Sequence, residues 1–236
     1  DNGYDEFSLG NTAFKTFSDT PGKDVQKTKA GSLRATWFGQ DNFTLTSVTS
    51  VVKTDSLYSY DSDWADPATD GNYDGFLSTE RDRSVFSQEI RIDSIEQTGA
   101  LGWIDRWTVG AYLHQLKEDS NVLYTEFDAV SARYESEYEA ESVALFGQIA
   151  HDFSDVSRLI VGLRYEYYQI DAESEGSFYG APLGGRSDKS DPLLGGKITL
   201  ELDVNETQML FANTTLGYKG GGANIASFTA PGDPLT

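Results

Sequence analysis

Hydrophobic and polar residues alternate along much of the chain. The clearest example runs from Arg158 to Tyr168, where Leu159, Val161, Leu163, Tyr165 and Tyr167 alternate with Ile160, Gly162, Arg164, Glu166 and Tyr168. A period of two is typical of a β-strand, because successive side chains point to opposite faces of a sheet. The pattern therefore predicts a strand with one apolar face and one mostly polar face.

The same pattern predicts eight strands in all. In five further segments the residues expected to face outward alternate with residues expected to face inward. The outward sets are Leu194, Ile198, Leu200 and Leu202; Leu210, Ala212, Thr214, Leu216 and Tyr218; Trp107, Val109, Ala111 and Leu113; Phe86, Ile90 and Ile92; and Leu33, Ala35 and Trp37. The inward sets, where the pattern gives them, are Gly195, Lys197, Thr199 and Glu201; Asn213, Thr215, Gly217 and Lys219; Ser87, Glu89, Arg91 and Asp93; and Arg34 and Thr36. The segment from Phe43 to Val52 is rich in threonine and valine and leaves its facing open.

The segment from Ser142 to Phe153 fits either a helix or a strand. Val143, Phe146, Ala150 and Phe153 fall near one helical face. Its neighbours decide the matter, because strands on both sides make it the hairpin partner of the segment from Arg158 to Tyr168, across the short turn 154–157.

The predicted connections alternate between short and long. The short ones are 40–42, 98–102, 154–157 and 203–207, whereas the long ones are 61–83, 119–141, 171–191 and the stretch from 219 onward. Outer-membrane barrels have short periplasmic turns and long extracellular loops. A secreted or periplasmic β-sandwich would also alternate, but the predicted strands are nearer the 9–11 residues of membrane-spanning strands than the usual 5–6. The pattern favours an all-β fold of antiparallel transmembrane β-barrel strands.

Composition agrees and excludes several classes. No apolar run approaches the roughly 20 residues of a membrane-spanning helix. The net charge of −20 argues against binding to nucleic acid, which requires clustered lysine and arginine. The chain has no cysteine, so a thiolate metal site and a thiol nucleophile are both excluded.

Seven phrases, in this order, resemble the barrel of a TonB-dependent outer-membrane receptor. They are FTLTSVTS (43–50), FSQEIRIDS (86–94), WTVGAYL (107–113), ESVALFGQIAHDFSD (141–155), LIVGLRYEYY (159–168), DPLLGGKITLELDVN (191–205) and LFANTTLGYKGGGAN (210–224), the last containing the most characteristic piece. Each phrase is weak alone, but together they span most of the chain at hairpin spacing.

The resemblance implies a plugged barrel of 22 strands. Residues 1–236 are then expected to be a partial barrel domain, about eight strands, without the plug, the TonB-contacting segment or the C-terminal strands. It also implies an outer-membrane receptor of a Gram-negative bacterium that imports a scarce nutrient, with a ferric siderophore or similar iron complex as the expected substrate. The expected partners are lipid, lipopolysaccharide, the plug, the TonB system and a small-molecule ligand. A passive porin and a structural or adhesive surface domain remain alternatives.

No catalytic constellation is present in the sequence, so an enzyme is not expected. The two histidines, His114 and His151, have no partners suited to a triad or a zinc site. The candidate site residues are instead those expected to face the lumen, where they either pair with one another or contact a ligand: Arg91, Arg164, Glu166, Lys197, Glu201, Asn213 and Lys219.

Acidic residues are concentrated in the first two long connections. Their simplest interpretation is a hydrated outer surface, and their functional interpretation is capture of cations. Asp70, Asn72 and Asp74 match the opening of a calcium-binding loop, but Arg81 stands where the bidentate glutamate should be. No resident cofactor is expected apart from a weak calcium ion in this loop.

Overall fold

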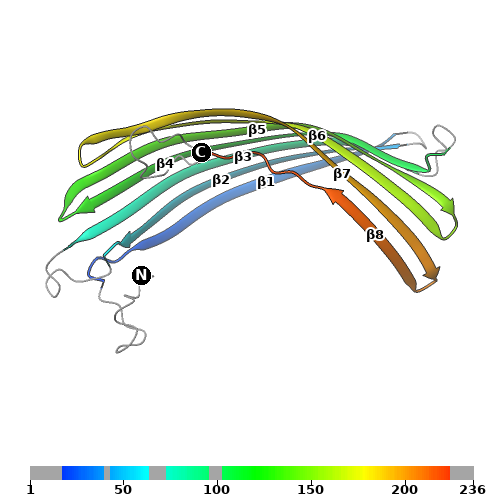
Figure 1. Ribbon diagram of the computed structural model, residues 1–236, viewed down its shortest axis with the longest axis horizontal. Coiled ribbons are helices and arrows are strands. Elements are labelled where there is room, and N and C mark those ends of the chain that lie inside the picture. Colours follow the sequence, from blue (N-terminus) through cyan, green and yellow to red (C-terminus); the bar gives the residue numbers. More distant parts are fainter. Residues whose placement is uncertain (1–17, 40–42, 64–72, 96–102, 224–236) are drawn as a thin grey trace.

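The protein forms a single antiparallel sheet in a computed structural model that describes residues 18–39, 43–63, 73–95 and 103–223. The strands are β1 (Lys23–Gly39), β2 (Phe43–Asp61), β3 (Gly75–Ser94), β4 (Arg106–Glu126), β5 (Ala129–Ser154), β6 (Ser157–Phe178), β7 (Ala181–Asn205) and β8 (Gln208–Leu216). Each pairs with the next in the chain, and the sheet bends into an arch (Figure 1). The predicted all-β class and eight strands are confirmed. Within the described ranges, no helix is long and apolar enough to cross a membrane.

Strand register confirms the predicted faces. Cross-strand partners share a face in an antiparallel sheet, and one continuous row joins Gly196, Leu163, Gly147, Val109, Ile92, Leu45 and Trp37 from β7 to β1. The row settles the facing of β2, because Leu45 lies between two residues that were predicted to point outward. Segment 142–153 is a strand, as its neighbours indicated.

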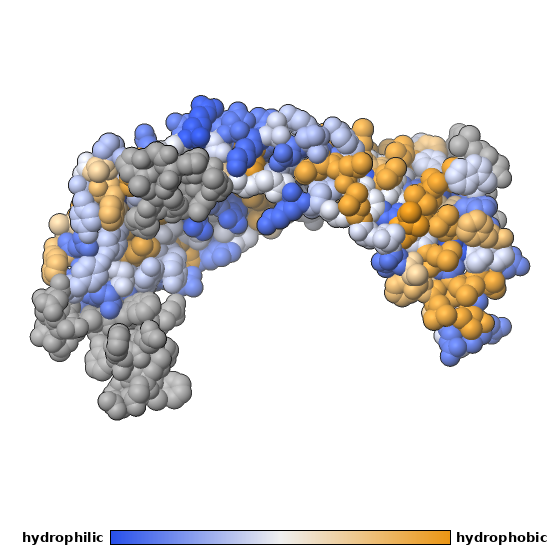
Figure 2. Space-filling view, viewed as in Figure 1, coloured by the Kyte–Doolittle hydropathy of each residue, from blue (hydrophilic) through white to orange (hydrophobic). Residues whose placement is uncertain are grey.

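The outward face is apolar near the short turns and exposed. Leu163 is 63% exposed and Leu145 is 64% exposed. Exposure of a whole band of apolar side chains is unfavourable for a sheet that faces water. Hydrophobic residues gather over the end where β7 and β8 are joined, whereas hydrophilic residues dominate the middle of the arch (Figure 2). We call this band of outward apolar residues, between the short turns and the level of Tyr167, the apolar band.

Two of the predicted long loops are instead continuous hairpins. Connections 119–141 and 171–191 were expected to be irregular, but β4 runs to Glu126, β5 starts at Ala129, β6 runs to Phe178 and β7 starts at Ala181. In the same way, β3 begins at Gly75, inside the predicted loop 61–83. Strands β5 and β7, of 26 and 25 residues, therefore extend far beyond the apolar band. We call these extensions the tall hairpins.

The polarity of the two faces reverses where the tall hairpins begin. On β6, the outward residues change from Tyr165 and Tyr167 to Gln169, Asp171 and Glu173. On the inner face of the same strand, Ile170 and Ala172 are each only 1% exposed. Below this level the outward face is suited to lipid, and above it the outward face is suited to water.

Two-residue turns close the tall hairpins. At the β4–β5 tip, Phe127 and Asp128 have φ of 47° and 61°, and at the β6–β7 tip Tyr179 and Gly180 have φ of 46° and 77°. Positive φ at both central residues defines the type I′ turn, whose twist matches that of the flanking strands. The turns explain why the hairpins continue without an irregular loop.

The end of β8 corrects one predicted facing. Alternation placed Tyr218 outward, but β8 ends at Leu216 and the chain leaves the sheet. The Tyr218 hydroxyl then bonds to Arg164 and Glu166 on the inner face. From there the chain follows β6 upward: Gly220 lies against the Tyr168 ring, and Ala223 packs against the cluster of Ala140, Ile170 and Ala172. We call residues 217–223 the inner strap.

Candidate functional site

The predicted lumen-facing residues lie on the inner face, with one exception. Arg91, Arg164, Glu166, Lys197, Glu201 and Asn213 share the inner face by register. Lys219 is exposed on the inner strap, beyond the end of β8, so strand alternation does not define its direction. The structure does not gather these residues into one site. Arg91, Arg164 with Glu166, and Glu201 belong to three separate groups, whereas Lys197 and Asn213 lie elsewhere on the inner face.

The first group centres on Arg164. Its guanidinium lies 2.9 Å from Glu166 Oε2, and its Nε donates to the Tyr218 hydroxyl over 2.8 Å. The Tyr218 hydroxyl in turn donates to Glu166 over 2.7 Å. The guanidinium also lies 5.3 Å from the centre of the Tyr112 ring and 6.0 Å from that of Phe146, within the range of cation–π attraction. This group ties β4, β5, β6 and the inner strap together.

The second and third groups are ion pairs within the wall. Arg91 contacts Glu89 at 3.3 Å and Asp93 at 2.9 Å, its neighbours two residues away on β3. Near the short turns, Arg158 joins Asp152 at 2.6 Å to Glu201 at 3.2 Å, and Arg106 also contacts Asp152. Such pairing lets a wall carry charge at the depth of the apolar band.

A fourth cluster joins the tips of the tall hairpins. The Tyr179 hydroxyl donates to Glu126 Oε2 over 2.5 Å, and the Ser131 and Tyr124 hydroxyls donate to the same carboxylate over 2.8 and 3.3 Å. The Tyr179 amide donates to the Ser131 carbonyl over 2.7 Å. These bonds connect the β6–β7 tip to the β4–β5 tip, and we call them the tip latch.

The tip latch also reaches the connection before β3. The Phe127 amide donates to the Asp74 carbonyl over 2.9 Å, and the Ser62 amide donates to the Gly75 carbonyl over 2.8 Å. Three successive connections at this end of the sheet are therefore held together by hydrogen bonds.

The calcium prediction falls mainly outside the described residues. Asp70 and Asn72 lie there, whereas Asp74 is described. Desolvation, together with the charges of Asp19, Asp128 and Asp61, raises the Asp74 pKa above its ordinary value. Within the described residues, no group of three or more histidines, cysteines or carboxylates is arranged to hold a metal. The calcium site stays a prediction.

Sequence reasoning missed several residues of these groups. Arg106, Asp152 and Arg158 lie close to turns where the alternating pattern ends, and a register shift between Asp152 and Ser154 displaces the pattern further. Tyr218 was missed because its inward turn depends on where β8 ends. The glycine run 220–222 was the available signal that the strand does not continue, since glycine weakens strands.

The chain matches a protein-family model over nearly its whole length. The model described as "TonB dependent receptor-like, beta-barrel" covers residues 1–235. No match was found among curated protein sequences.

Solved structures of similar fold include three receptors. The ferric yersiniabactin uptake receptor FyuA from Yersinia pestis has a TM-score of 0.75 at 15% identity, over 87% of this chain and 30% of its own. The siderophore receptor PiuA from Acinetobacter baumannii has a TM-score of 0.56 at 14% identity, over 81% and 32%. The ferric-catecholate import receptor Fiu from E. coli K12 has a TM-score of 0.59 at 15% identity, over 88% and 38%. The chain thus spans about a third of the length of each.

Proposed function

Because this chain belongs to the TonB-dependent receptor β-barrel family, whose members are receptors and transporters of the Gram-negative outer membrane, we propose that it forms part of a receptor that imports a scarce nutrient. We further propose that the nutrient is a ferric siderophore or a similar iron complex. The match over residues 1–235 is the observation that carries the proposal. The three similar structures support the substrate class, because they are named as a ferric yersiniabactin uptake receptor, a siderophore receptor and a ferric-catecholate import receptor.

The two faces of the sheet suit this role. The outward apolar band, from Leu159 to Tyr167 on β6, matches the 9–11 residues that a strand needs to cross a bilayer. Above it, the outward acidic residues of the tall hairpins would lie beside lipopolysaccharide. The inner wall, with its ion pairs, would surround the plug, and energy would come through the TonB system.

Uptake by the full-length receptor tests the proposal. The receptor would be expressed in a strain that lacks its own siderophore receptors, and entry of radiolabelled iron would be followed with a panel of siderophores. We expect uptake of at least one ferric siderophore, and we expect deletion of TonB to abolish it.

Two outcomes would contradict the proposal. Passage of small solutes at equal rates with and without TonB would indicate a passive porin. Binding of cells to surfaces, with no uptake of any iron complex tested, would indicate an adhesive surface domain.

A further inference from the structure

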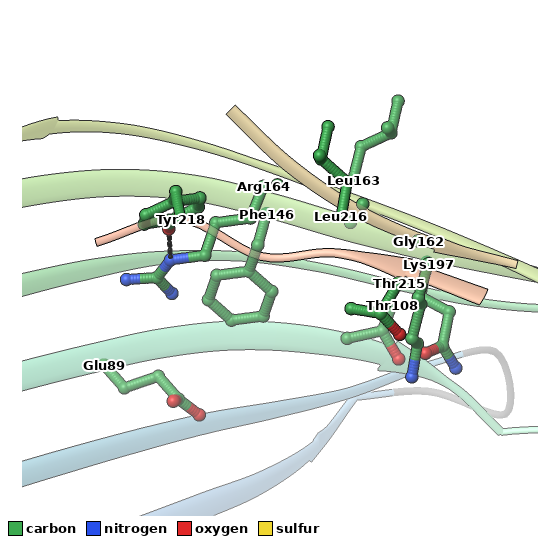
Figure 3. Close-up of a pocket in the computed structure, with 14 residues that line it drawn as sticks. Glu89, Thr108, Phe146, Gly162, Leu163, Arg164, Lys197, Thr215, Leu216 and Tyr218 are labelled. Carbon is green, nitrogen blue, oxygen red and sulfur yellow. Dashed lines mark hydrogen bonds between the residues drawn. The ribbon is translucent and has the colours of Figure 1, made fainter. Parts of the chain in front are cut away.

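The outward face of the sheet contains an apolar hollow near the short turns. Its volume is about 520 Å³, within the roughly 300–1,000 Å³ of ordinary ligand sites. Leu163 borders the hollow and points to the opposite side of the sheet from Arg164 and Lys197 (Figure 3). The hollow therefore opens toward the lipid, and we call it the lipid groove. Its lining includes Trp107, Val109, Gly147, Ile149, Val161 and Leu163.

The lipid groove exists because Gly147 has no side chain. Val109 on β4 and Leu163 on β6 are its cross-strand partners and share its outward face. Among the described residues, a Cβ atom at Gly147 would meet only the Thr108 carbonyl oxygen, at an ordinary 3.4 Å. No neighbouring side chain fills the space above this glycine, so in a bilayer the space is filled by lipid.

A polar pair lies on the outward face between the lipid groove and the short turn 155–156. His151 is paired with the outward Leu159, and its Nδ1 lies 3.1 Å from Asp105 Oδ2. The Asp152 amide donates to the same Oδ2 over 2.7 Å. Asp105 Oδ1 accepts no hydrogen bond from the described residues. One oxygen of this carboxylate is therefore held in place, while the other is available for a cation.

Two exposed aromatic rings flank His151. The ring centres of Trp103 and Phe153 lie 6.1 and 4.9 Å from that of His151, both in edge-to-face geometry. Tryptophan is typical of the membrane–water interface, and the face of its ring attracts ammonium groups. A carboxylate oxygen and an indole ring, the two kinds of group that bind an ammonium, therefore lie beside the same histidine.

The distance between the lipid groove and the polar pair suits one leaflet of a bilayer. Gly147 and His151 are four residues apart on β5, which is about 14 Å at roughly 3.4 Å per residue. Half of the hydrocarbon core is about 15 Å thick. A lipid whose headgroup contacts Asp105 can therefore place an acyl chain over Gly147. Short turns lie on the periplasmic side of outer-membrane barrels, so this lipid belongs to the periplasmic leaflet.

We propose that the lipid groove, Asp105 and Trp103 form one binding site for a phosphatidylethanolamine molecule of the periplasmic leaflet. An acyl chain packs over Gly147, and the ammonium group donates to Asp105 Oδ1 and lies against the Trp103 ring. Exclusion of water does not favour one contact over another inside a bilayer, so affinity comes from packing and from the charge of the headgroup. The inference rests on the proposed function only in requiring that the strands span the outer membrane.

Native mass spectrometry of the full-length receptor measures this binding. The receptor would be delipidated in detergent and mixed with phosphatidylethanolamine or phosphatidylglycerol of identical acyl chains. We expect one retained phosphatidylethanolamine, with a preference of about threefold over phosphatidylglycerol, as a partly exposed ion pair supplies. A phosphatidylethanolamine with a photoreactive acyl chain should label the β5 peptide that contains Ile149.

Filling the groove tests the acyl-chain contact. Gly147→Leu should lower retention of both lipids about threefold or more, because the chain loses its packing contacts. Gly31→Leu is the matched control. Gly31 is paired with Val51 on the outward face of β1, and a Cβ atom there meets nothing within 4 Å. This second variant should retain lipid as the wild type does.

Neutralising Asp105 tests the headgroup contact. Asp105→Asn keeps an oxygen for the Asp152 amide but removes the charge, so the preference for phosphatidylethanolamine should disappear while the groove still retains lipid. Asp188→Asn removes an outward carboxylate from the β6–β7 tall hairpin, where Asp188 is paired with Asp171. The preference should survive in this control.

Four results would overturn the proposal: no preference in the wild type, photolabelling spread evenly over the outward face, equal retention by Gly147→Leu and Gly31→Leu, or an unchanged preference in Asp105→Asn. The first two need no variant. Heat-dependent gel migration identifies folded barrel in each sample. None of these measurements uses an iron complex, so a receptor for a different nutrient would leave the lipid result intact.

Discussion

Leu163 and Arg164 are adjacent in the chain but face different surroundings. Leu163 is 63% exposed on the outward face, whereas Arg164 bonds to Glu166 and Tyr218 on the inner face. A strand makes this possible, because each step of one residue exchanges the two faces. The effect of a charge should therefore depend on the parity of its position more than on its place in the sequence.

Arginine substitutions at three positions test this parity. Leu163→Arg should destabilise the folded barrel by about 2–4 kcal/mol, because it places a charge on the lipid face near the middle of the apolar band. Leu200→Arg, nearer the short turn, should cost less, and Thr199→Arg on the inner face should cost least. The folded fraction of the full-length receptor in membranes, measured by heat-dependent gel migration, gives the ranking. Equal tolerance at all three positions would show that the facing is wrong.

The tall hairpins show how the same element serves two surroundings. On β5, the outward residues Glu135, Glu137 and Glu139 alternate with Tyr134, Ser136 and Tyr138 on the inner face. This is the reverse of the pattern within the apolar band. The backbone pairing continues where the polarity of the two faces reverses. Strand formation in the tall hairpins therefore depends on this pairing and on the two-residue turn, and not on which face is apolar.

The tip latch should depend on pH. Hydrogen bonds from Tyr179, Ser131 and Tyr124 stabilise the Glu126 carboxylate and hold its pKa below the usual 4.5. A lowered carboxyl pKa gives stability that is complete above pH 4.5 and is lost as the pH falls through the lowered value. The bond to Glu126 also raises the Tyr179 pKa to about 12, so the contribution of Tyr179 is complete below its usual 10 and is lost as the pH rises through about 12.

Hydrogen exchange of the Tyr179 amide measures the latch. Its protection should be constant near neutral pH and should fall in acid, after correction for the intrinsic exchange rate. Tyr179→Phe keeps the ring but removes the hydroxyl, so this variant should be less protected at neutral pH and should show a weaker acid dependence. Acid-dependent loss of equal size in both proteins would mean that Glu126 does not control the tips.

At the scale of the whole molecule, the sheet has two different ends and two open edges. Short turns lie at one end and tall hairpins at the other, while β1 and β8 each pair with a single neighbour among the described strands. An edge strand exposes unpaired backbone groups and favours pairing with a further strand. Both edges are therefore available, among the described residues, for pairing with further strands.

The two ends predict a membrane orientation. Epitope tags inserted at the tips 127–128 and 179–180 of the full-length receptor should be labelled on intact cells, whereas a tag at 155–156 should be labelled only after the outer membrane is opened. Each insertion falls in a two-residue turn, so the strands beside it can keep their register. Labelling of the 155–156 tag on intact cells, with silence at both hairpin tips, would invert the orientation.

The sequence by itself determined the strands within the apolar band and the facing of most of them, whereas the facing of β2 came from its register with β1 and β3. One face there must suit lipid and the other a polar interior, so Leu159 to Tyr167 show the alternation plainly. It also determined that Lys197, Glu201 and Asn213 face inward, because parity within a regular strand fixes direction. The family resemblance depended on these same segments.

Only the tertiary structure decided the extent of the hairpins, the facing of Tyr218 and the grouping of charges. Above the apolar band the outward side faces water, so the acidic sequence there resembles that of a loop. The hydrogen bonding between strands shows that these residues belong to the sheet. Tyr218 turns inward because β8 ends two residues earlier and Arg164 and Glu166 offer its hydroxyl partners. Ion pairs across strands, such as that between Arg158 and Glu201, depend on the register between the strands. Register brings together residues that are far apart in the chain, and the alternation within one strand does not specify it.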